Sequence, residues 1–269
     1  MKRFFVHLGG LFLALVLLLC NCQSSSNSPT LMEQDSMLSR VEKQIEEKKL
    51  RQQQVEEFRE KYLPENFTEQ IKKYLPRIRK YSKWYGLDWR LIVAQILKES
   101  RFKEDALSNM GAVGLMQIMP KTAREITREL DIAYITKDPR ENITAGIYHL
   151  YKQQQYFTNA DAENRIKLAL AAYNCGPARI FDAQDIARFK QLNPDTWDAV
   201  KECLPLLTTE HWGLHLEVWE QGTPNYGYFY GYEQTVDYVD DIMEKYDILR
   251  QMYKPDIDNL AMEKVDSNM

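Results

Sequence analysis

A single carboxyl group stands at the end of a long apolar stretch. The segment 89–98 is apolar on nearly every side when it is drawn as a helix, and Glu99 follows it directly. Ile92, Ile96 and Glu99 have the spacing that places three side chains on one helix face. Burial and the negative end of the helix dipole both disfavour an ionised carboxylate there. The pattern therefore predicts a carboxyl group that stays protonated near neutral pH and acts as a general acid.

The helix alone leaves a second interpretation open, in which Glu99 reaches water or pairs with Arg101 or Lys103. Glycosidases normally set two carboxylates across the bond that they cleave, but no second acid is well placed here. The other acids nearby suit a helix N-cap, a polar loop or the outer side of a later helix: Asp88, Glu104, Asp105 and Asp237. A site with one acid needs a nucleophile from another source.

Four short motifs occur in a fixed order along the chain. They are Glu99-Ser100, Gly114-Leu115-Met116-Gln117, Ala172-Tyr173-Asn174 and Thr235-Val236-Asp237-Tyr238-Val239. In this order and spacing the chain resembles the lysozyme-like lytic transglycosylases of bacterial cell walls. The resemblance covers about residues 67–253, and its C-terminal part is most similar to the catalytic module of the membrane-bound type F enzymes.

The resemblance implies a fold and a reaction. The fold is mainly α, a lysozyme-like single globular domain with a cleft, of the kind shared by goose-type lysozyme and the soluble lytic transglycosylases. Glu99 would protonate the β-1,4 glycosidic oxygen between N-acetylmuramic acid and N-acetylglucosamine, and its carboxylate would then deprotonate the C6 hydroxyl of the muramoyl residue. The 1,6-anhydro ring that forms consumes no water, and the resemblance implies neither a cofactor nor a metal.

The same resemblance assigns further residues to substrate binding. Ser100 and Asn174 would hydrogen-bond near Glu99 or the acetamido group of the substrate. Tyr173 and Tyr238 would orient Glu99 and the saccharide. The loop residues Gly114, Leu115, Met116 and Gln117 would line the cleft. The tyrosine, methionine and glycine residues also have a structural interpretation, as core, gap-filling or turn residues.

Two positions depart from the family pattern. Gln234 stands where the family usually has Glu, and Cys175 stands where it usually has a small residue such as Ala. Two other functions stay open: a goose-type muramidase, in which water attacks the same bond, and a non-catalytic peptidoglycan-binding protein. The intact Glu99-Ser100 pair argues against the non-catalytic alternative.

The N-terminus has the pattern of a secretory signal. Lys2 and Arg3 precede an apolar run over 8–19, which is too short to span a bilayer comfortably. The run closes on Cys20 and Cys22 before a Ser-rich stretch, as in bacterial lipoproteins; Cys22 is the favoured lipidation site and Cys20 the alternative. A plain signal peptide or an uncleaved anchor is also open. All of these interpretations predict export, and the lipoprotein pattern predicts a periplasmic protein anchored in the outer membrane.

The sequence predicts four parts: a lipoprotein-type signal segment (1–22), a polar tether and charged helical stalk (23–66), the catalytic domain (67–253) and a polar tail (254–269). A short stalk thus stands where the type F enzymes carry a solute-binding domain. The stalk is dense in Glu, Lys, Gln and Arg, and its apolar residues lose their helical register before Leu50. A solvated helix is therefore favoured over a coiled coil.

Composition limits the classes of function. The chain has 269 residues, a formal net charge of -4, 44% apolar and 28% charged residues, which excludes a disordered chain, a collagen and a polytopic membrane protein. The mildly acidic balance argues against a nucleic-acid partner. The expected partners are peptidoglycan glycan strands and, through the lipid anchor, a membrane; wall-synthesis or division proteins are further candidates.

Helices separated by short loops are expected over most of the catalytic domain. The pair His211 and His215 suits a metal only if that stretch is helical, and no third ligand supports it. The segment 226–232, rich in Tyr and Gly, suits either an aromatic wall of the sugar groove or a packed loop. Cys175 and Cys203 suit either a disulfide or buried free thiols. The predicted helices cover 71–84, 89–99, 122–130, 142–157, 165–173, 178–189, 195–204 and 234–252.

Overall fold

The computed structural model describes residues 31–253, with side chains from Met37 onward. The chain divides into two compact units, the first ending at Gln52 and the second beginning at Gln53. The described part of the first unit is a stretch of one helix. The second unit holds every residue predicted to take part in catalysis or substrate binding.

Helix α2 (Leu31–Tyr62) begins in the first unit and ends in the second. Its side chains are exposed throughout 37–54, as expected of a charge-rich helix without a continuous apolar stripe. Phe58 is only 2% exposed and belongs to the hydrophobic core of the second unit, together with the half-buried Tyr62 that packs against it. That core therefore starts before residue 67.

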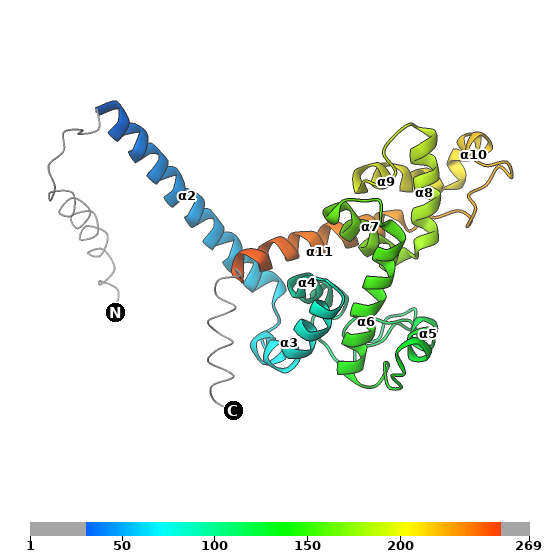
Figure 1. Cartoon of the computed structure of the whole chain (residues 1–269), viewed down its shortest axis with the longest axis horizontal. Coiled ribbons are helices and arrows are strands. Elements are labelled where there is room, and N and C mark those ends of the chain that lie inside the picture. Colours follow the sequence, from blue (N-terminus) through cyan, green and yellow to red (C-terminus); the bar gives the residue numbers. More distant parts are fainter. Residues whose placement is uncertain (1–30, 254–269) are drawn as a thin grey trace. The chain divides into compact units, whose positions relative to one another are not determined.

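The second unit is built from helices (Figure 1). No strand occurs within 31–253, where the only β-type pairings are two isolated bridges in the loop that follows Glu99. The prediction of a mainly α fold is confirmed. The helices are α3 (Phe67–Trp84), α4 (Trp89–Glu99), α5 (Pro120–Leu130), α6 (Pro139–Gln154), α7 (Ala162–Cys175), α8 (Pro177–Phe189), α9 (Trp197–Cys203), α10 (Trp212–Val218) and α11 (Tyr232–Met252), with short 3-10 turns η1 (Gln155–Phe157), η2 (Leu204–Leu207) and η3 (Thr209–His211).

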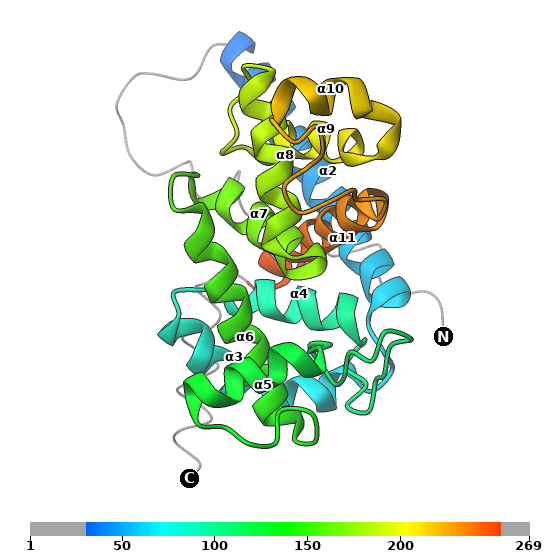
Figure 2. The same cartoon turned by 90° about the vertical axis from the view of Figure 1, so that its right-hand side faces the viewer.

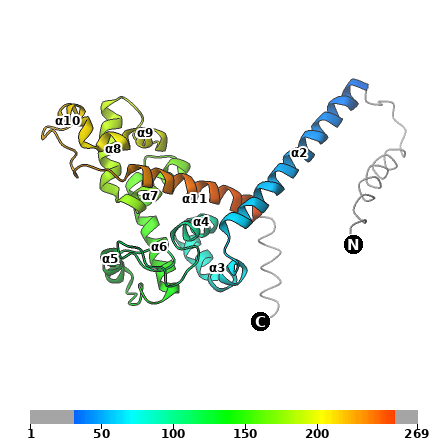
Figure 3. The same cartoon turned by 180° about the vertical axis from the view of Figure 1, so that it is seen from behind.

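Helix α4 is the centre of the second unit. Every side chain from Leu91 to Leu97 is buried, because the helix is apolar on nearly all sides and packs against both α3 and α11. Figure 3 shows α11 running beside α4, and Figure 2 shows α6 packed beside α3. Helix α7 continues the contact from α6 to α11. Glu99 therefore ends a helix that is held on several sides.

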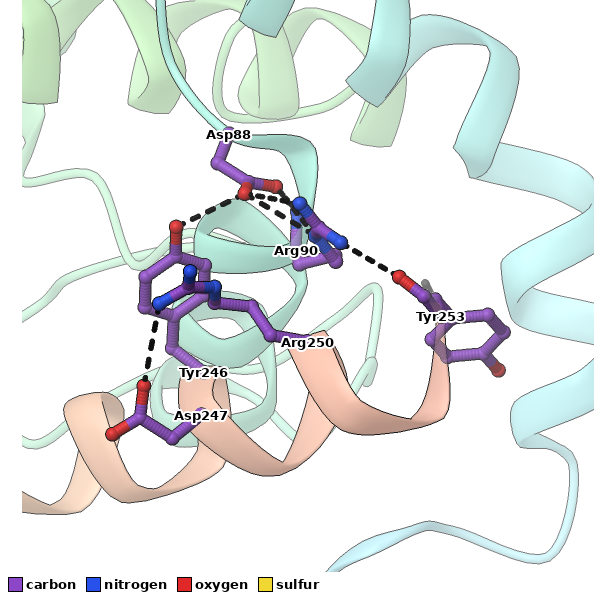
Figure 4. A network of polar contacts seen from close by, with 6 residues as sticks. All are labelled: Asp88, Arg90, Tyr246, Asp247, Arg250 and Tyr253. Carbon is purple, nitrogen blue, oxygen red and sulfur yellow. Dashed lines mark hydrogen bonds and ion pairs between the residues drawn. The ribbon is translucent and has the colours of Figure 1, made fainter. Parts of the chain in front are cut away.

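The N-terminal end of α4 is fixed to the C-terminal end of α11 by a polar network (Figure 4). Asp88 caps α4 by accepting a hydrogen bond from the Arg90 backbone N–H, and it also accepts one of 3.0 Å from the Tyr246 hydroxyl. The Arg90 guanidinium donates to the Tyr253 carbonyl oxygen over 2.6 Å. Burial alone would raise the pKa of Asp88, but the hydrogen bonds from Arg90 and Tyr246 outweigh it and hold the pKa below its ordinary value.

All eight predicted helices are present, and the bounds of α4 and its Asp88 cap agree with the prediction. One helix was missed. Helix α10 is short, and His215 is its only buried residue, whereas Trp212 and Leu216 are exposed. A helix without a buried apolar stripe leaves no periodic signal in the sequence.

No helix in 31–253 is both long enough and apolar enough to cross a membrane. The signal segment with Cys20 and Cys22 and the polar tail lie outside the described residues. Cys175 and Cys203 are free thiols rather than a disulfide, and burial raises the pKa of each to about 11.

Candidate active site

Glu99 and Tyr238 meet where α4 and α11 pack together. The Tyr238 hydroxyl donates a 2.5 Å hydrogen bond to Oε1 of Glu99, and it accepts one of 3.1 Å from the Gln95 amide. Gln95 and Tyr238 are buried, whereas Glu99 keeps part of its surface accessible. The carboxyl group is thus held by a fixed phenol on one side and can be approached from another.

Burial sets the protonation state of Glu99. Desolvation raises its pKa to about 7, although the hydrogen bond from Tyr238 and the charge of Lys98 act in the opposite direction. The predicted pairing with Arg101 or Lys103 is not formed in the described part of the chain, where Arg101 instead donates to the Lys61 carbonyl oxygen. At neutral pH the Glu99 carboxyl group can both give and accept a proton.

A half-buried ion pair involves Lys98, the residue that precedes Glu99. Asp241 bonds Lys98 over 2.9 Å and also pairs with Lys245, which is nearly inaccessible and lies 3.8 Å from the centre of the Tyr62 ring. Burial alone would raise the pKa of Asp241, but the two lysines outweigh it and hold the pKa below its ordinary value. Asp241 therefore stays ionised and balances Lys98, the cation that opposes the raised pKa of Glu99.

The loop Gly114-Leu115-Met116-Gln117 is held through its backbone carbonyl groups. The Ser100 hydroxyl donates to the Leu115 carbonyl oxygen over 2.9 Å, and the Tyr173 hydroxyl donates to the Met116 carbonyl oxygen over 2.8 Å. Ser100 and Tyr173 come from the ends of α4 and α7, so two of the predicted motifs clamp a third. The resemblance implied that Ser100 bonds near Glu99 or the acetamido group and that Tyr173 orients Glu99 and the saccharide, whereas both hydroxyl groups bond the backbone of this loop.

Two residues of this loop point into the core. The side chains of Leu115 and Met116 are fully buried, which differs from the expectation that they line a cleft, because the left-handed backbone at Gly114 and Gln117 turns them inward. Gln117 stays half-exposed, and its amide donates to the carbonyl oxygens of Ala106 and Gly114 over 3.1 and 2.9 Å.

Asn142 of α6 is the residue that organises the loop, and sequence reasoning missed it. Its side chain is buried, accepts a 2.8 Å hydrogen bond from the Met116 N–H and donates to the carbonyl oxygens of Val113 and Ile135 over 2.9 and 3.0 Å. A Cβ atom at Gly114 would lie 2.6 Å from the Asn142 amide nitrogen. Gly114 therefore makes room for the Asn142 side chain.

Gly146 lets α6 pass close to Met116, and its substitution tests how tightly the loop is packed. A Cβ atom at Gly146 would lie 2.6 Å from Met116 Cβ. We expect Gly146→Ala to destabilise the protein by about 1–3 kcal/mol because the loop must shift. The control is Gly213→Ala in α10, where an added Cβ meets nothing within 4 Å and helix propensity favours Ala. Urea unfolding measures both; equal stability of the two variants contradicts the packing argument.

Asn174 and Tyr173 form the side of the site contributed by α7. Asn174 accepts a 2.9 Å hydrogen bond from the Thr235 hydroxyl at the start of α11, and both it and Tyr173 are half-exposed. The Tyr173 ring lies 4.8 Å from the ring of His149, whose pKa burial lowers to about 4. Burial raises the pKa of Tyr173 well above its ordinary value, so both rings are neutral at pH 7.

The histidine pair and the segment 226–232, which the sequence left with more than one interpretation, make contacts within the protein. His215 is buried in α10 and one ring nitrogen lies 2.7 Å from the Leu206 carbonyl oxygen. No group of three or more His, Cys, Asp or Glu within 31–253 is arranged to hold a metal ion. The segment 226–232 is both packed and exposed, since Asp182 accepts from the Tyr226 N–H over 3.0 Å whereas the Tyr226 and Tyr230 rings face outward.

The chain is similar in sequence to a known family and to several known proteins. Residues 76–195 match the family described as the transglycosylase SLT domain, and the chain thus carries an SLT domain. It is 36% identical over 184 residues to membrane-bound lytic murein transglycosylase F of Desulfosudis oleivorans, over 67% of this chain and 37% of that protein. The protein of the same name from Pseudomonas putida is 32% identical over 204 residues, covering 73% of this chain and 39% of that protein. This chain therefore spans well under half the length of these curated relatives.

Two solved structures also align with the chain. Lytic transglycosylase Slt of Pseudomonas aeruginosa is 25% identical, with a TM-score of 0.45 over 74% of this chain and 27% of that one. The 70 kDa soluble lytic transglycosylase of Escherichia coli is 23% identical, with a TM-score of 0.43 over 66% of this chain and 24% of that one. The family assignment rests on the sequence match.

Proposed function

We propose that this chain is a peptidoglycan lytic transglycosylase that cleaves the β-1,4 bond between N-acetylmuramic acid and N-acetylglucosamine. The observation that carries the proposal is the Glu99 carboxyl group, which has a pKa raised to about 7 and a hydrogen bond from Tyr238. An acid of that pKa is poised to transfer a proton at neutral pH. The SLT domain and the similarity to lytic murein transglycosylases support the choice of substrate.

The reaction needs one carboxyl group that acts twice. Glu99 gives its proton to the glycosidic oxygen as the bond from that oxygen to C1 of the muramoyl residue breaks, and N-acetylglucosamine leaves with a free hydroxyl group. The Glu99 carboxylate then takes the proton of the muramoyl C6 hydroxyl, whose oxygen bonds to C1. The proton returns to Glu99, no water is consumed, and the product is a 1,6-anhydromuramoyl end.

Residues of the predicted motifs that keep part of their surface accessible are the candidates for direct contact with sugar. Gln117, Tyr173 and Asn174 are half-exposed and are each anchored by a hydrogen bond to a neighbouring element. The buried residues Ser100, Gly114, Leu115, Met116 and Tyr238 shape the site from behind, with Tyr238 orienting the carboxyl group.

Mass spectrometry of muropeptides released from purified sacculi tests the reaction. Lytic cleavage predicts products that are lighter by one water than the hydrolysed disaccharides. Hydrolysed products indicate a muramidase of the goose type on the same residues. Release of nothing above a no-protein control supports a non-catalytic peptidoglycan-binding protein.

The pH dependence follows from the raised pKa of Glu99. Only the protonated form can act as the acid, so kcat/KM is expected to fall about tenfold per pH unit above pH 7. Below pH 7 Glu99 is already protonated, so its titration does not lower kcat/KM further. Initial rates on sacculi between pH 5 and 9 measure this, and an alkaline limb centred near an ordinary carboxyl pKa of 4.5 contradicts it.

The Tyr238→Phe variant tests whether Tyr238 both orients the Glu99 carboxyl group and lowers its pKa. Its hydroxyl stabilises the Glu99 carboxylate, so removing it is expected to raise the pKa of Glu99 further and to move the alkaline limb to higher pH. The rate at the optimum is expected to fall by roughly tenfold or more, the loss typical of one hydrogen bond to a charged group. Tyr134→Phe, at an exposed site, is the control. A fall in rate without any shift of the limb contradicts the assignment.

The whole chain fits an exported enzyme held at a membrane. We propose that Cys22, or alternatively Cys20, is lipidated and that 23–66 links this anchor to the catalytic domain over 67–253, on the periplasmic side of the outer membrane. The names of the curated relatives, which are membrane-bound enzymes, support an envelope location. The mass of the mature N-terminal peptide, compared with a Cys22→Ala variant, identifies the modified residue.

A further inference from the structure

Five aromatic side chains, from α3, from the residue that caps it and from α6, form a continuous cluster of ring contacts, here called the aromatic platform. The rings are those of Tyr81, Trp84, Tyr85, Tyr148 and Tyr151. Tyr81 and Trp84 lie 6.2 Å apart with planes only 7° from parallel, and Tyr85 lies 5.0 Å from Tyr151. None of these residues belongs to the four motifs of the candidate active site.

The aromatic platform is partly open to solvent. Trp84 is 70% exposed, and its four neighbours are half-buried. An exposed tryptophan held between other rings is unusual for a surface without a ligand, because it leaves a large apolar area in water.

Basic side chains flank the aromatic platform on the α3 side, and one acid, Glu129, lies beside Tyr148 and pairs with Lys152. Helix α3 carries six basic residues and one acidic residue, Glu69, in a chain whose net charge is negative. The Arg77 and Lys80 side chains lie 5.6 and 5.5 Å from the centre of the Tyr81 ring, and Lys152 lies 5.7 Å from that of Tyr148. The ligand that this surface attracts is therefore anionic.

The aromatic platform is fixed before any ligand arrives. Arg77 donates a 3.0 Å hydrogen bond to the Thr144 hydroxyl, which ties α3 to α6 beneath the rings. Lys152 pairs with Glu129 over 2.7 Å at the other edge. A rigid surface of flat rings loses little conformational entropy on binding.

We propose that the aromatic platform is a second binding site for the peptidoglycan glycan strand, separate from the site of bond cleavage. The C–H faces of successive sugars would stack on Trp84 and Tyr81, because the partly positive C–H groups meet the negative face of an aromatic ring. The carboxylates of the peptide stems would face Arg77 and Lys80. This proposal rests on the proposed function, which supplies the polymer.

Helix α4 separates Tyr85 from Glu99 along the chain. Tyr85 lies four residues before the first residue of α4, Glu99 is its last residue, and the eleven residues of α4 span roughly 16 Å. A strand held at the aromatic platform raises the local concentration of strand at Glu99 without any new contact at the active site. The aromatic platform therefore favours polymer over short fragments.

A membrane surface fits the aromatic platform less well. Insertion into a bilayer uses exposed aliphatic side chains beside the aromatic ones. The large exposed apolar residues of 71–85 and 144–152 are limited to Trp84, whereas Trp212 in α10 lies one turn from the exposed Leu216. Trp212, which is 63% exposed, is therefore a matched control of similar exposure in a different setting.

Retention on sacculi tests the proposal. The full chain carrying Glu99→Gln, which leaves strands uncut, is mixed with purified sacculi and pelleted, alone and combined with Trp84→Ala, Lys80→Glu or Trp212→Ala. Trp84→Ala is expected to weaken retention about three- to tenfold, the loss of one ring stack. Lys80→Glu is expected to weaken it in the same direction, and Trp212→Ala is expected to leave it unchanged. The same proteins are pelleted with phosphatidylglycerol vesicles.

Each outcome of these pelleting experiments supports or overturns the proposed second binding site. Equal retention of the Trp84→Ala and Trp212→Ala proteins on sacculi overturns the proposal that the aromatic platform binds the glycan strand. If Trp84→Ala weakens retention on vesicles but not on sacculi, the proposal is also overturned, and the surface is assigned to a membrane. If Trp84→Ala lowers thermal stability, Lys80→Glu, at an exposed site, carries the test. Anhydro products from the unsubstituted chain report on the proposed function separately, so a failure of the aromatic platform is distinguishable from a failure of catalysis.

Discussion

Replacing Glu99 with glutamine is expected to lower the turnover of sacculi by about 10²- to 10⁴-fold, the contribution of a general acid and base. Glutamine keeps the shape of the side chain and can still accept the hydrogen bond from Tyr238, but it has no proton to transfer. Since a single carboxyl group carries both proton transfers in the proposed reaction, no neighbouring acid compensates. Release of muropeptides over time measures the effect.

The same substitution is expected to stabilise the protein at alkaline pH. The folded-state pKa of Glu99 is about 7 against an ordinary 4.5, so its contribution to stability is complete below pH 4.5 and is lost as pH rises to 7. Glu99→Gln removes that loss, which is on the order of 1–3 kcal/mol at pH 8. The control is Glu104→Gln, which loses only a partly exposed pair with Lys73. A Glu99→Gln protein that is inactive and is also less stable at pH 8 than the Glu104→Gln protein would contradict the raised pKa assigned to Glu99.

Asn142→Ala is expected to cost at least about 2 kcal/mol of folding free energy and most of the activity. The substitution leaves the buried Met116 N–H and the Ile135 carbonyl oxygen without their partner, and the Val113 carbonyl oxygen keeps only its hydrogen bond from the Ile118 N–H. Each unsatisfied buried group costs about 1–3 kcal/mol. The loop that Asn142 holds is the one that Ser100 also holds, so activity falls with stability.

Asn66→Ala is the control for that loss, because Asn66 is exposed and makes no side-chain capping bond at the start of α3. It is expected to change stability by less than about 0.5 kcal/mol. Denaturant unfolding at pH 6 compares the two variants with the parent. A cost for Asn142→Ala as small as that of Asn66→Ala would show that the loop does not depend on this amide.

The part of the fold that the sequence predicts best is the part governed by local chemistry. The apolar stretch and the cap at Asp88 together determine the bounds of α4, since both signals lie within the helix itself. Glu99 was correctly placed at the end of that helix. Its raised pKa was also foreseeable, because burial at a helix C-terminus is encoded by neighbouring residues.

The residues that sequence reasoning missed act across long distances in the chain. Gln95 bonds Tyr238 of α11, and Asn142 bonds a loop that precedes it by some thirty residues. Only the packing of helices brings such groups together. Gln95 left one signal, as the polar residue within the apolar run 91–97, whereas Asn142 left none.

The loop residues show a second limit of the sequence. Leu115 and Met116 were predicted to face a substrate, yet the left-handed backbone at Gly114 turns them into the core. A motif identifies a conformation, but it does not state which atoms face outward. The carbonyl groups of these two residues, rather than their side chains, receive the hydroxyl groups of Ser100 and Tyr173.

The most direct test of the central claim is the titration of the Glu99 carboxyl group itself. In protein labelled with ¹³C at the glutamate carboxyl carbons, the signal lost in Glu99→Gln identifies this group. We expect that signal to titrate with a pKa of about 7, well above the ordinary carboxyl value of 4.5. A Glu99 signal that titrates near the ordinary carboxyl value would contradict the claim that this carboxyl group holds a proton at neutral pH.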